Sequence, residues 1–183
     1  MRSAIAKIAP HDSEERFRAM GVEVLRATAR FTGRDSLDVG GRRLVFRRAV
    51  IAAGSHAVLP PIPGLGLVPF LTHETIFDLL ACPEHLLVLG GGPIGLEMAL
   101  AHRRLGARVT VVEEAQIASR EDPECVDVLR AALAAEGVEL REGLGVAELA
   151  PAPGGLLARL TDGTTIKASH LLVAAGRAAR VDG

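Results

Sequence analysis

Tryptophan and tyrosine are absent from the 183-residue sequence, and aromatic residues make up only 3% of it. So few rings provide no stacking platform for bases or sugars, and the lack of tyrosine excludes every enzyme class that needs a catalytic tyrosine. Basic and acidic residues nearly balance at a net charge of −1, which leaves no electrostatic footprint for nucleic acid or an anionic membrane. No apolar stretch approaches the roughly 20 residues of a membrane span, and the N-terminal sequence lacks the continuous apolar core of a secretion signal.

Cysteine is also scarce. Cys82 and Cys125 stand far apart, with neither CxxC nor CxxxxC spacing. This predicts a soluble cytoplasmic protein from a reducing compartment, with two buried or inert thiols. None of the six histidines belongs to a metal-binding or triad pattern, so we expect no metal site and assign no catalytic residue to the chain.

The first third of the sequence predicts a helix–strand–hairpin–strand order. The segment "LPPIPGLGLVP" (59–69), which is rich in proline and glycine, predicts a connector at a domain boundary. Before it we expect helical character over 1–20 with Asp12 or Ser13 as a cap, a strand in 22–31, a hairpin around Gly40-Gly41, and a strand in "RRAVIAAGS" (47–55). After the connector, "THETIFDLLA" (72–81) predicts a short helix capped by Thr72.

The remainder alternates dense apolar strands with helices. "HLLVLG" (85–90) and "ARVTVVEE" (107–114) lack period-two alternation, as strands covered on both faces do. A helix over 93–106 lies between them, and a second helix begins at Asp122-Pro123 and ends at Gly137. We expect short strands after it, in "VELREG", "LGVAELA", "GLLARLT" and "TIKA", broken by "PAPGG" and "TDGT" and closed by "HLLVAAG".

Two segments of the chain resemble each other. Each has a helix that ends at Gly-Val-Glu and closes on a strand that ends in Ala-Ala-Gly, at 52–54 and at 174–176. Only the second segment is preceded by a strand, a glycine-rich loop and a helix. Either two apolar strands are similar by chance, or the chain is a piece of something longer with an internal repeat.

The glycine-rich loop is the main functional signal. Gly90, Gly92 and Gly95 of "GGGPIG" fit the G-x-G-x-x-G pattern, with Pro93 and Ile94 between them. The pattern lies between a buried strand and a helix, where the glycines permit a tight turn, a close approach of the backbone to a pyrophosphate, and close helix–strand packing. The loop therefore predicts dinucleotide binding at a helix N-terminus.

An acidic residue completes the pattern. Glu113 lies 23 residues after Gly90, at the end of the second buried strand, where a carboxylate can accept the ribose hydroxyls of the adenosine half. A 2′-phosphate would meet that charge, so NAD is favoured over NADP. Arg120 is the one nearby basic residue that could favour NADP instead, by pairing with its 2′-phosphate.

Taken together, "LVLGGGPIGLEMA", "VTVVE", "VIAAGS", "PPIPGL" and "LLVAAGR" resemble the flavin-dependent pyridine nucleotide-disulfide oxidoreductases of the lipoamide dehydrogenase and mercuric reductase type. The resemblance implies an α/β chain: a Rossmann-like three-layer ββα dinucleotide-binding domain with an antiparallel crossover meander, plus an incomplete FAD-domain segment rich in β-strand. It implies a partial FAD segment over 1–60 and an NAD-binding domain over 65–183.

The same resemblance carries further residues over. Glu97 matches an acid that the family places near the nicotinamide, and it could equally be a helix-dipole acid. Gly176 and Arg177 match the family's Gly-Arg turn, and Arg177 could equally be a surface arginine. The sequence departs from the family at Ala53, where threonine is common, and after Arg177, where proline is expected. It holds no N-terminal flavin loop and no redox cysteine pair.

The resemblance implies that this chain binds NAD(H), weakly and without turning over disulfide alone, and that in the full-length enzyme hydride passes from NADH to FAD. Its implied partners are NADH, the remaining FAD and interface domains, and a second copy in a homodimer, with residues 1–20 partly disordered if no dimer forms. The alternatives are a stand-alone NADH-sensing or interaction module, a fragment of another flavin-dependent NADH:acceptor reductase, and a stand-alone dehydrogenase.

Overall fold

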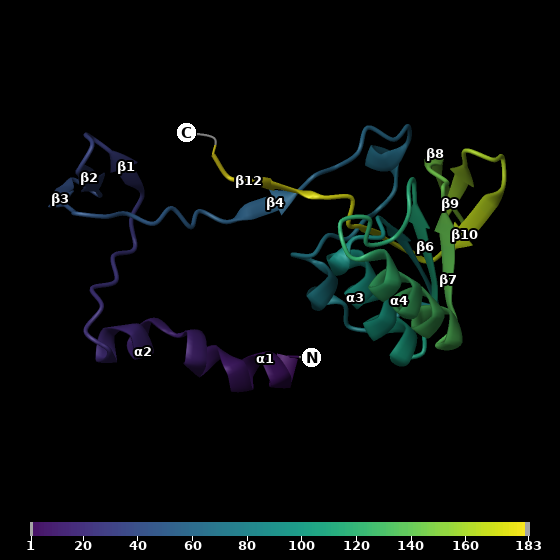
Figure 1. Cartoon of the computed structure of the whole chain (residues 1–183), viewed down its shortest axis with the longest axis horizontal. Coiled ribbons are helices and arrows are strands. Elements are labelled where there is room, and N and C mark those ends of the chain that lie inside the picture. Colours follow the sequence, from purple (N-terminus) through teal and green to yellow (C-terminus); the bar gives the residue numbers. More distant parts are fainter. Residues whose placement is uncertain (1, 182–183) are drawn as a thin grey trace. The chain divides into compact units, whose positions relative to one another are not determined.

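The computed structural model describes residues 2–181, and the chain divides into two compact units, Met1–Ala52 and Ala53–Gly183 (Figure 1). The division lies eight residues before the end of the segment that the sequence assigns to a FAD domain. That assignment of 1–60 and 65–183 to FAD and NAD domains stays a prediction, because the two units are defined by packing and not by ligands.

The first unit combines short helices with a small sheet. Ser13 caps the second helix, as predicted, by accepting a hydrogen bond from the Arg16 backbone N–H at 3.2 Å. The hairpin at Gly40-Gly41 is also confirmed, since β2 and β3 pair antiparallel around it. The elements are α1 (Arg2–Ile8), η1 (Ala9–Asp12), α2 (Glu14–Ala19), β1 (Ala29–Phe31), β2 (Ser36–Val39) and β3 (Arg42–Val45), with strand order β1-β2-β3.

The second unit is built on a four-stranded parallel sheet of order β11-β5-β6-β7, and a three-stranded antiparallel sheet, β10-β9-β8, lies against it (Figure 1). Its elements are β4 (Ser55–Ala57), η2 (Leu65–Leu67), η3 (Ile76–Asp78), β5 (His85–Leu89), α3 (Pro93–Arg104), β6 (Arg108–Glu113), α4 (Pro123–Ala135), β7 (Val138–Glu142), β8 (Val146–Ala152), β9 (Gly155–Leu160), β10 (Thr165–Ala168), β11 (His170–Val173) and β12 (Arg177–Ala179).

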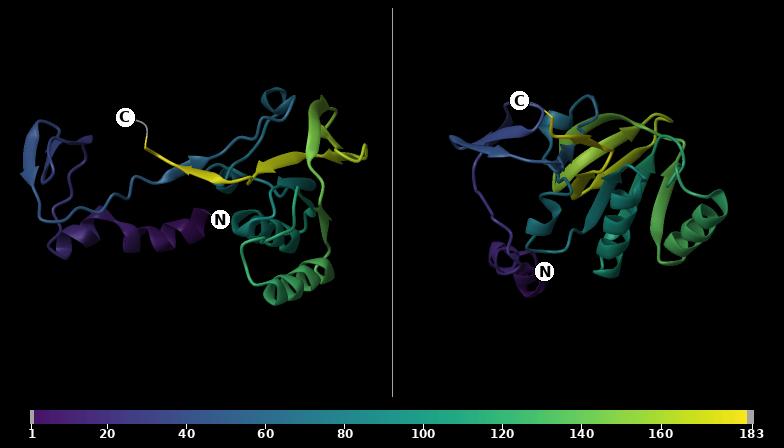
Figure 2. Two further views of the ribbon diagram at one scale, coloured as in Figure 1. Left: turned by 45° about the horizontal axis from the view of Figure 1, so that its top comes forward. Right: turned by 60° about the vertical axis from the view of Figure 1, so that its left-hand side comes forward.

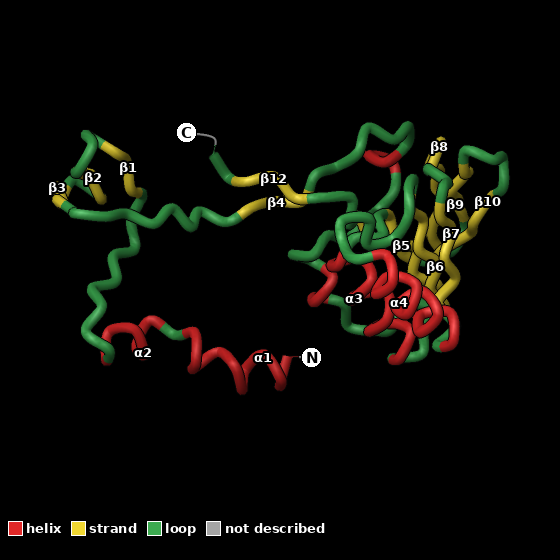
Figure 3. Tube along the Cα trace, viewed as in Figure 1, coloured by secondary structure: helices red, strands yellow, loops and turns green. Residues whose placement is uncertain are grey.

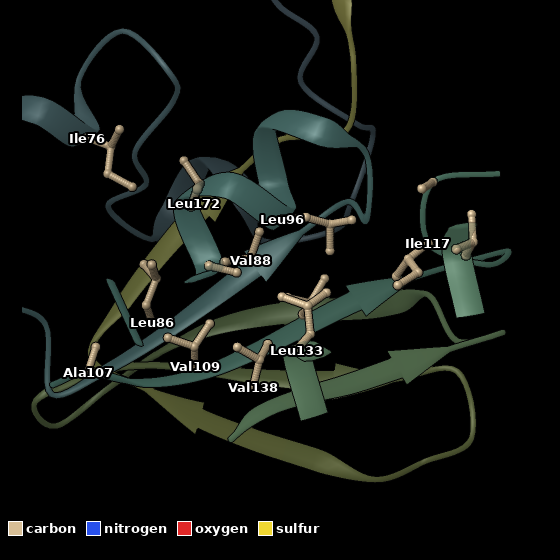
Figure 4. Packing of buried hydrophobic residues seen from close by; sticks show 14 residues of the cluster. Ile76, Leu86, Val88, Leu96, Ala107, Val109, Ile117, Leu133, Val138 and Leu172 are labelled. Atoms are coloured by element: carbon tan, nitrogen blue, oxygen red, sulfur yellow. The ribbon is translucent and has the colours of Figure 1, made fainter. Parts of the chain in front are cut away.

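Alternate residues of β5 explain the three layers. Leu86 and Val88 point to the side where α3 and α4 pack, in a cluster that includes Leu96 and Leu133 (Figure 4). Leu87 and Leu89 point to the other side, into a second cluster formed with the β8–β10 sheet. Both faces of the strand are therefore covered by apolar side chains, which is why its sequence shows no polar alternation.

The predicted fold class is confirmed. Helices α3 and α4 share one face of the parallel sheet, and β8–β10, the crossover between β7 and β11, covers the other (Figures 1 and 2). The helix boundaries also agree, because Asp122 caps α4 by accepting from the Glu124 N–H at 3.0 Å, and Gly137 follows it at φ +82°. Between Arg2 and Val181, no helix has the length and apolarity that crossing a bilayer requires.

The strand predicted at 47–55 does not form. Residues 47–54 are loop, and Val50 and Ile51 are 91% and 75% exposed (Figure 3). A parallel strand is stable only when neighbouring strands satisfy its backbone groups, and no described residue pairs with residues 47–53. Only Gly54 and Ser55, at the end of the segment, bond to residues of β12 and its end. The second copy differs, because β11 pairs along its length with β5. The two similar sequences therefore adopt different structures.

Residues that follow the two Ala-Ala-Gly sequences nevertheless pair with each other. β4 and β12 form an antiparallel ribbon in which Ser55 lies opposite Ala179. The bonds at its ends are reciprocal: the carbonyl of Gly176 accepts from the Val58 N–H at 3.0 Å, and that of Gly54 accepts from the Arg180 N–H at 3.1 Å. Both glycines have positive φ, +78° at Gly54 and +139° at Gly176.

Two shorter predictions are also wrong, and a third is confirmed. Of residues 22–31 only β1 is a strand, because its partner β2 offers just three paired positions. The helix predicted at 72–81 is reduced to the turn η3, since only one of its side chains, Ile76, is fully buried and a short helix depends on packing. "PAPGG" separates two strands, as predicted, because the turn at Pro153 and Gly154 divides β8 from β9; β8 itself runs on through Pro151, which an edge strand tolerates.

The two thiols are exposed. Cys82 and Cys125 both lie at the surface as free cysteines. The prediction that they are buried is therefore wrong, and the remaining expectation is that they are inert.

A buried histidine links the two sheets of the second unit. His85 Nδ1 donates to the Lys167 carbonyl of β10 at 2.7 Å, and its Nε2 lies 2.9 Å from the Thr110 hydroxyl, which also reaches Glu139 at 3.0 Å. Burial lowers the pKa of His85, and nearby Arg108 adds to this, while the Lys167 carbonyl, Glu139 and Glu84 oppose it. The folded protein therefore favours the neutral imidazole.

The free energy of unfolding is expected to fall as pH decreases from about 7.5 to about 5.5. The lowered pKa of His85 means that the unfolded chain binds the proton first, so stability is present above the unfolded value and is lost as pH drops through it. Urea unfolding at several pH values measures this slope, and His85→Gln should flatten it. A slope of opposite sign, or one unchanged in His85→Gln, would show that His85 is not the group responsible.

Candidate functional site

The glycine turn begins where β5 ends. Gly90 has φ +107°, a conformation that favours glycine, and its N–H donates to the Val112 carbonyl of β6 at 2.9 Å. Gly92 is the N-cap of α3 and Pro93 its first residue, an arrangement suited to proline because the missing N–H has no helical partner there. The chain thus turns from the sheet into a helix within three residues.

The glycines of this turn differ in what they leave room for. A Cβ on Gly90 would lie 2.5 Å from the Ala174 carbonyl oxygen, and one on Gly95 would lie 2.1 Å from the Gly90 carbonyl oxygen. Both positions therefore require glycine for packing. A Cβ on Gly92 would meet nothing within 4 Å, and the backbone there is ordinary, at φ −76°. Space is therefore open beside Gly92, at the start of the helix.

The first turn of α3 points its amides at this space. The N–H groups of Ile94 and Gly95 have no carbonyl four residues earlier within the helix, whereas the Leu96 N–H donates to the Gly92 carbonyl at 3.0 Å. Free amides and the positive end of the helix dipole favour an anion.

Glu113 lies at the end of β6, next to the turn. Its Oε2 accepts from the Gly91 N–H at 2.7 Å, and its Oε1 accepts from the Ala115 N–H at 3.0 Å. A carboxylate has about four lone-pair sites, so capacity remains for two further donors. The carboxylate is thus both part of the turn and available to a ligand.

These groups line one cavity at the carboxyl edge of the parallel sheet. Its volume is about 600 Å³, within the range of about 300–1,000 Å³ typical of small-molecule sites. A second cavity of about 240 Å³ shares Gly90, Glu113 and Ala175 with it. Of the predicted site residues, the larger cavity is lined by Gly90, Gly92, Pro93, Ile94, Glu113, Gly176 and Arg177.

The other two predicted residues lie elsewhere. Gly95 is buried beneath the turn, where it allows helix and strand to approach. Glu97 is exposed on α3 and is not part of the cavity wall. The role that the resemblance gives Glu97, near a nicotinamide, stays a prediction.

The sequence did not identify much of the wall. Arg120 was noted only as a nearby base, and the structure places it on the wall, within the loop that follows β6. The signal that could have found this loop is its position, because ligands bind beyond the carboxyl ends of parallel strands. Further lining residues are Gly91, His73, Gln116, Ala118, Ser119, Glu121, Val173, Ala174 and Ala175.

His73 and Glu74 belong to the segment 72–81 that the sequence predicts as a short helix. They lie instead in a loop, where His73 contributes to the cavity wall and Glu74 forms an ion pair with Arg180 at 2.8 Å. Within residues 2–181, no group of three or more histidine, cysteine, aspartate or glutamate side chains could hold a metal ion.

Comparisons with known proteins show the family to which the chain belongs. The family model described as pyridine nucleotide-disulphide oxidoreductase matches residues 5–183. A mercuric reductase of Streptomyces lividans is 38% identical over 171 residues, which cover 89% of this chain and 36% of that protein. The chain thus spans little more than a third of that relative.

Two solved structures are similar along nearly the whole chain. LpdA from Mycobacterium tuberculosis matches with a TM-score of 0.81 and 26% identity, over 99% of this chain and 43% of its own. The flavoprotein disulfide reductase RclA from Escherichia coli matches with a TM-score of 0.79 and 26% identity, over 96% of this chain and 42% of its own. With a family model that covers almost every residue, the chain belongs to the pyridine nucleotide-disulphide oxidoreductase family, whose characterised members are oxidoreductases.

Proposed function

We propose that the second unit binds NAD(H) at the carboxyl edge of its parallel sheet. The observation that carries this proposal is the open space beside Gly92, bounded by the first-turn amides of α3. A pyrophosphate there would receive the amides of Ile94 and Gly95 and the positive end of the helix dipole. The same cavity of about 600 Å³ is lined by Glu113 and by Arg177, which leaves room for the two halves of a dinucleotide.

The adenosine ribose would lie by Glu113. Its carboxylate already accepts two backbone N–H groups and has capacity for two ribose hydroxyls. A 2′-phosphate would meet its charge, so NADH is the proposed cofactor and NADPH the weaker ligand. Arg120 lies on the same wall, and its positive charge would reduce the difference in affinity between NADH and NADPH.

The nicotinamide half would extend toward the residues after β11, where Gly176 and Arg177 line the cavity. In a longer polypeptide of this family, the proposed role of the bound NADH is to deliver hydride to FAD. Residues 2–52 hold no glycine turn between a strand and a helix, so the described residues supply no flavin cradle. The proposed contribution of the second unit is to bind and orient the dinucleotide.

The proposed partners of the chain are those that the family resemblance implies. A second copy of the chain, and the FAD and interface domains of a parent protein, are the proposed partners. Residues Arg2–Ala19 are helical in the single chain, apart from Ser13.

Gly92→Thr is expected to weaken NADH binding at least about tenfold, or about 1.4 kcal/mol, while the melting temperature stays close to that of the wild type. Threonine and glycine are similar as N-caps, and a Cβ at this position meets no protein atom within 4 Å, so the new side chain extends into the space proposed for the pyrophosphate. Titration calorimetry with NADH, on the whole chain, measures the affinity.

Gly66→Thr is the matched control. Gly66 also has open space and no positive φ, and it lies outside both cavities, so this variant should bind NADH as the wild type does. If the folded wild type releases no heat with NADH, or if Gly92→Thr binds it unchanged, the proposal is wrong. NADPH binding tighter than NADH would overturn the NAD preference and assign the adenosine side to Arg120.

A further inference from the structure

Glu142, at the end of β7, occupies the strand position next to Glu113. The two residues are paired in the parallel register of β6 and β7, so two carboxylates lie side by side at the edge where the cavity opens. Glu113 lines that cavity and Glu142 does not. What Glu142 contacts is the loop that forms the wall.

The contact is a hydrogen bond to the backbone. The Ile117 N–H donates to Glu142 Oε1 at 2.7 Å. Ile117 is completely buried, and a buried N–H without a hydrogen-bond partner is destabilising. The Glu142 carboxylate therefore satisfies an amide that the irregular loop around it leaves without a strand or helix partner.

Arg130 on α4 fixes the carboxylate in turn. Its Nε donates to Glu142 Oε2 at 2.8 Å, and its terminal nitrogen donates to Oε1 at 3.1 Å, a bidentate arrangement. The Arg130 hydrogen bond and the Ile117 amide keep the pKa of Glu142 below its ordinary value. The carboxylate is thus held ionised, and its orientation is set by a helix.

The loop transmits this position to the glycine turn. A Cβ on Gly91 would lie 2.8 Å from Ile117 Cγ2, and the Ala118 N–H donates to the Gly91 carbonyl at 2.8 Å. Ala118 has φ +47°, the one positive φ outside glycine within residues 2–181. Such a conformation persists only where surrounding bonds hold it, and the bonds on either side of it end at Glu142 and at Gly91.

We propose that Glu142, oriented by Arg130, is a positioning residue for the cofactor: it holds residues 117 and 118 against the glycine turn and so shapes the adenosine-side wall of the cavity. The inference rests on the proposed function, because its ligand is NADH. It assigns Glu142 no contact with the dinucleotide. Its effect reaches the ligand through Ile117, Ala118 and Gly91.

Three variants separate this role from general stability. Glu142→Ala removes the acceptor, and is expected to weaken NADH binding about tenfold, because small displacements of a wall misplace the groups that it carries. Glu142→Gln keeps an oxygen for the Ile117 N–H, and should restore affinity to within about threefold of the wild type. Glu136→Ala is the control: Glu136 also pairs with an arginine, Arg104, but at the far end of α4 from the cavity wall.

Calorimetric titration with NADH at neutral pH measures each affinity, and the binding stoichiometry reports the folded fraction. If Glu142 holds the wall, the wild type, Glu136→Ala and Glu142→Gln should all bind NADH more tightly than Glu142→Ala does. Equal binding by Glu142→Ala and the wild type would overturn the inference while leaving the proposed function intact. Absence of binding in the wild type would instead overturn the proposed function. If Glu142→Gln were as weak as Glu142→Ala, the backbone hydrogen bond would not be the cause.

Discussion

Gly95→Ala is expected to destabilise the second unit by about 3 kcal/mol and to abolish NADH binding with it. The added Cβ would lie 2.1 Å from the Gly90 carbonyl oxygen and 3.4 Å from Val88 Cγ1. Both neighbours belong to β5 or to the turn after it, so helix α3 must move away from the sheet. The movement would displace the first turn of the helix relative to the sheet edge, and the proposed phosphate site would be lost.

Urea unfolding followed by circular dichroism measures this loss. Alanine is a better helix former than glycine, so helix propensity alone predicts the opposite sign. Gly66→Ala serves as the control, because its Cβ meets no atom within 4 Å. If Gly95→Ala were as stable as the wild type, helix α3 and β5 would not be in the close contact described here.

Leu156→Ala is expected to cost about 2–5 kcal/mol in the free energy of unfolding. Leu156 is completely buried between β9 and the parallel sheet, in the cluster that contains Leu87 and Leu89. Removing three carbons there leaves a cavity in the layer that covers the sheet on the side away from the helices.

The neighbouring residue provides a matched control. Leu157 is 38% exposed and points the other way along β9, so Leu157→Ala should cost well below half as much. Thermal and chemical unfolding of the two variants compare the same substitution at adjacent positions. Similar losses would indicate that the antiparallel sheet does not pack with Leu156 inward.

The sequence predicts those parts of the fold that local signals determine. The segment 85–113 combines two dense apolar strands with a glycine turn and a proline at the first helical position, and the structure follows it closely. The helix after Asp122 is equally well marked by its cap. In both cases the residues that specify the element lie within it or beside it.

Predictions failed where an element depends on distant residues. "RRAVIAAGS" has the composition of a buried strand, but among residues 2–181 the backbone of its first seven residues, 47–53, finds no strand to pair with. Cys82 and Cys125 are small and apolar enough to be buried, and only packing places them at the surface. No local pattern indicates either result.

The candidate site divides in the same way. Gly90, Gly92 and Glu113 follow a spacing that reflects one strand–turn–helix–strand unit, and they meet at one cavity. The wall formed by the loop after β6 depends on Ala118 in an unusual conformation and on a hydrogen bond from Ile117 to Glu142, 25 residues away. In the sequence, Glu142 looks like any acid at the end of a strand.

The ribbon of β4 and β12 has a consequence for how the second unit is connected. It holds Ser55 beside Ala179, so the chain enters and leaves the unit at one place. A unit whose two ends are paired can be inserted into a loop of another protein with little distortion of its host. It can also be circularly permuted: a short linker would join position 180 to position 54, and new ends could open at the exposed turn of Asp162 and Gly163, which lies outside both cavities.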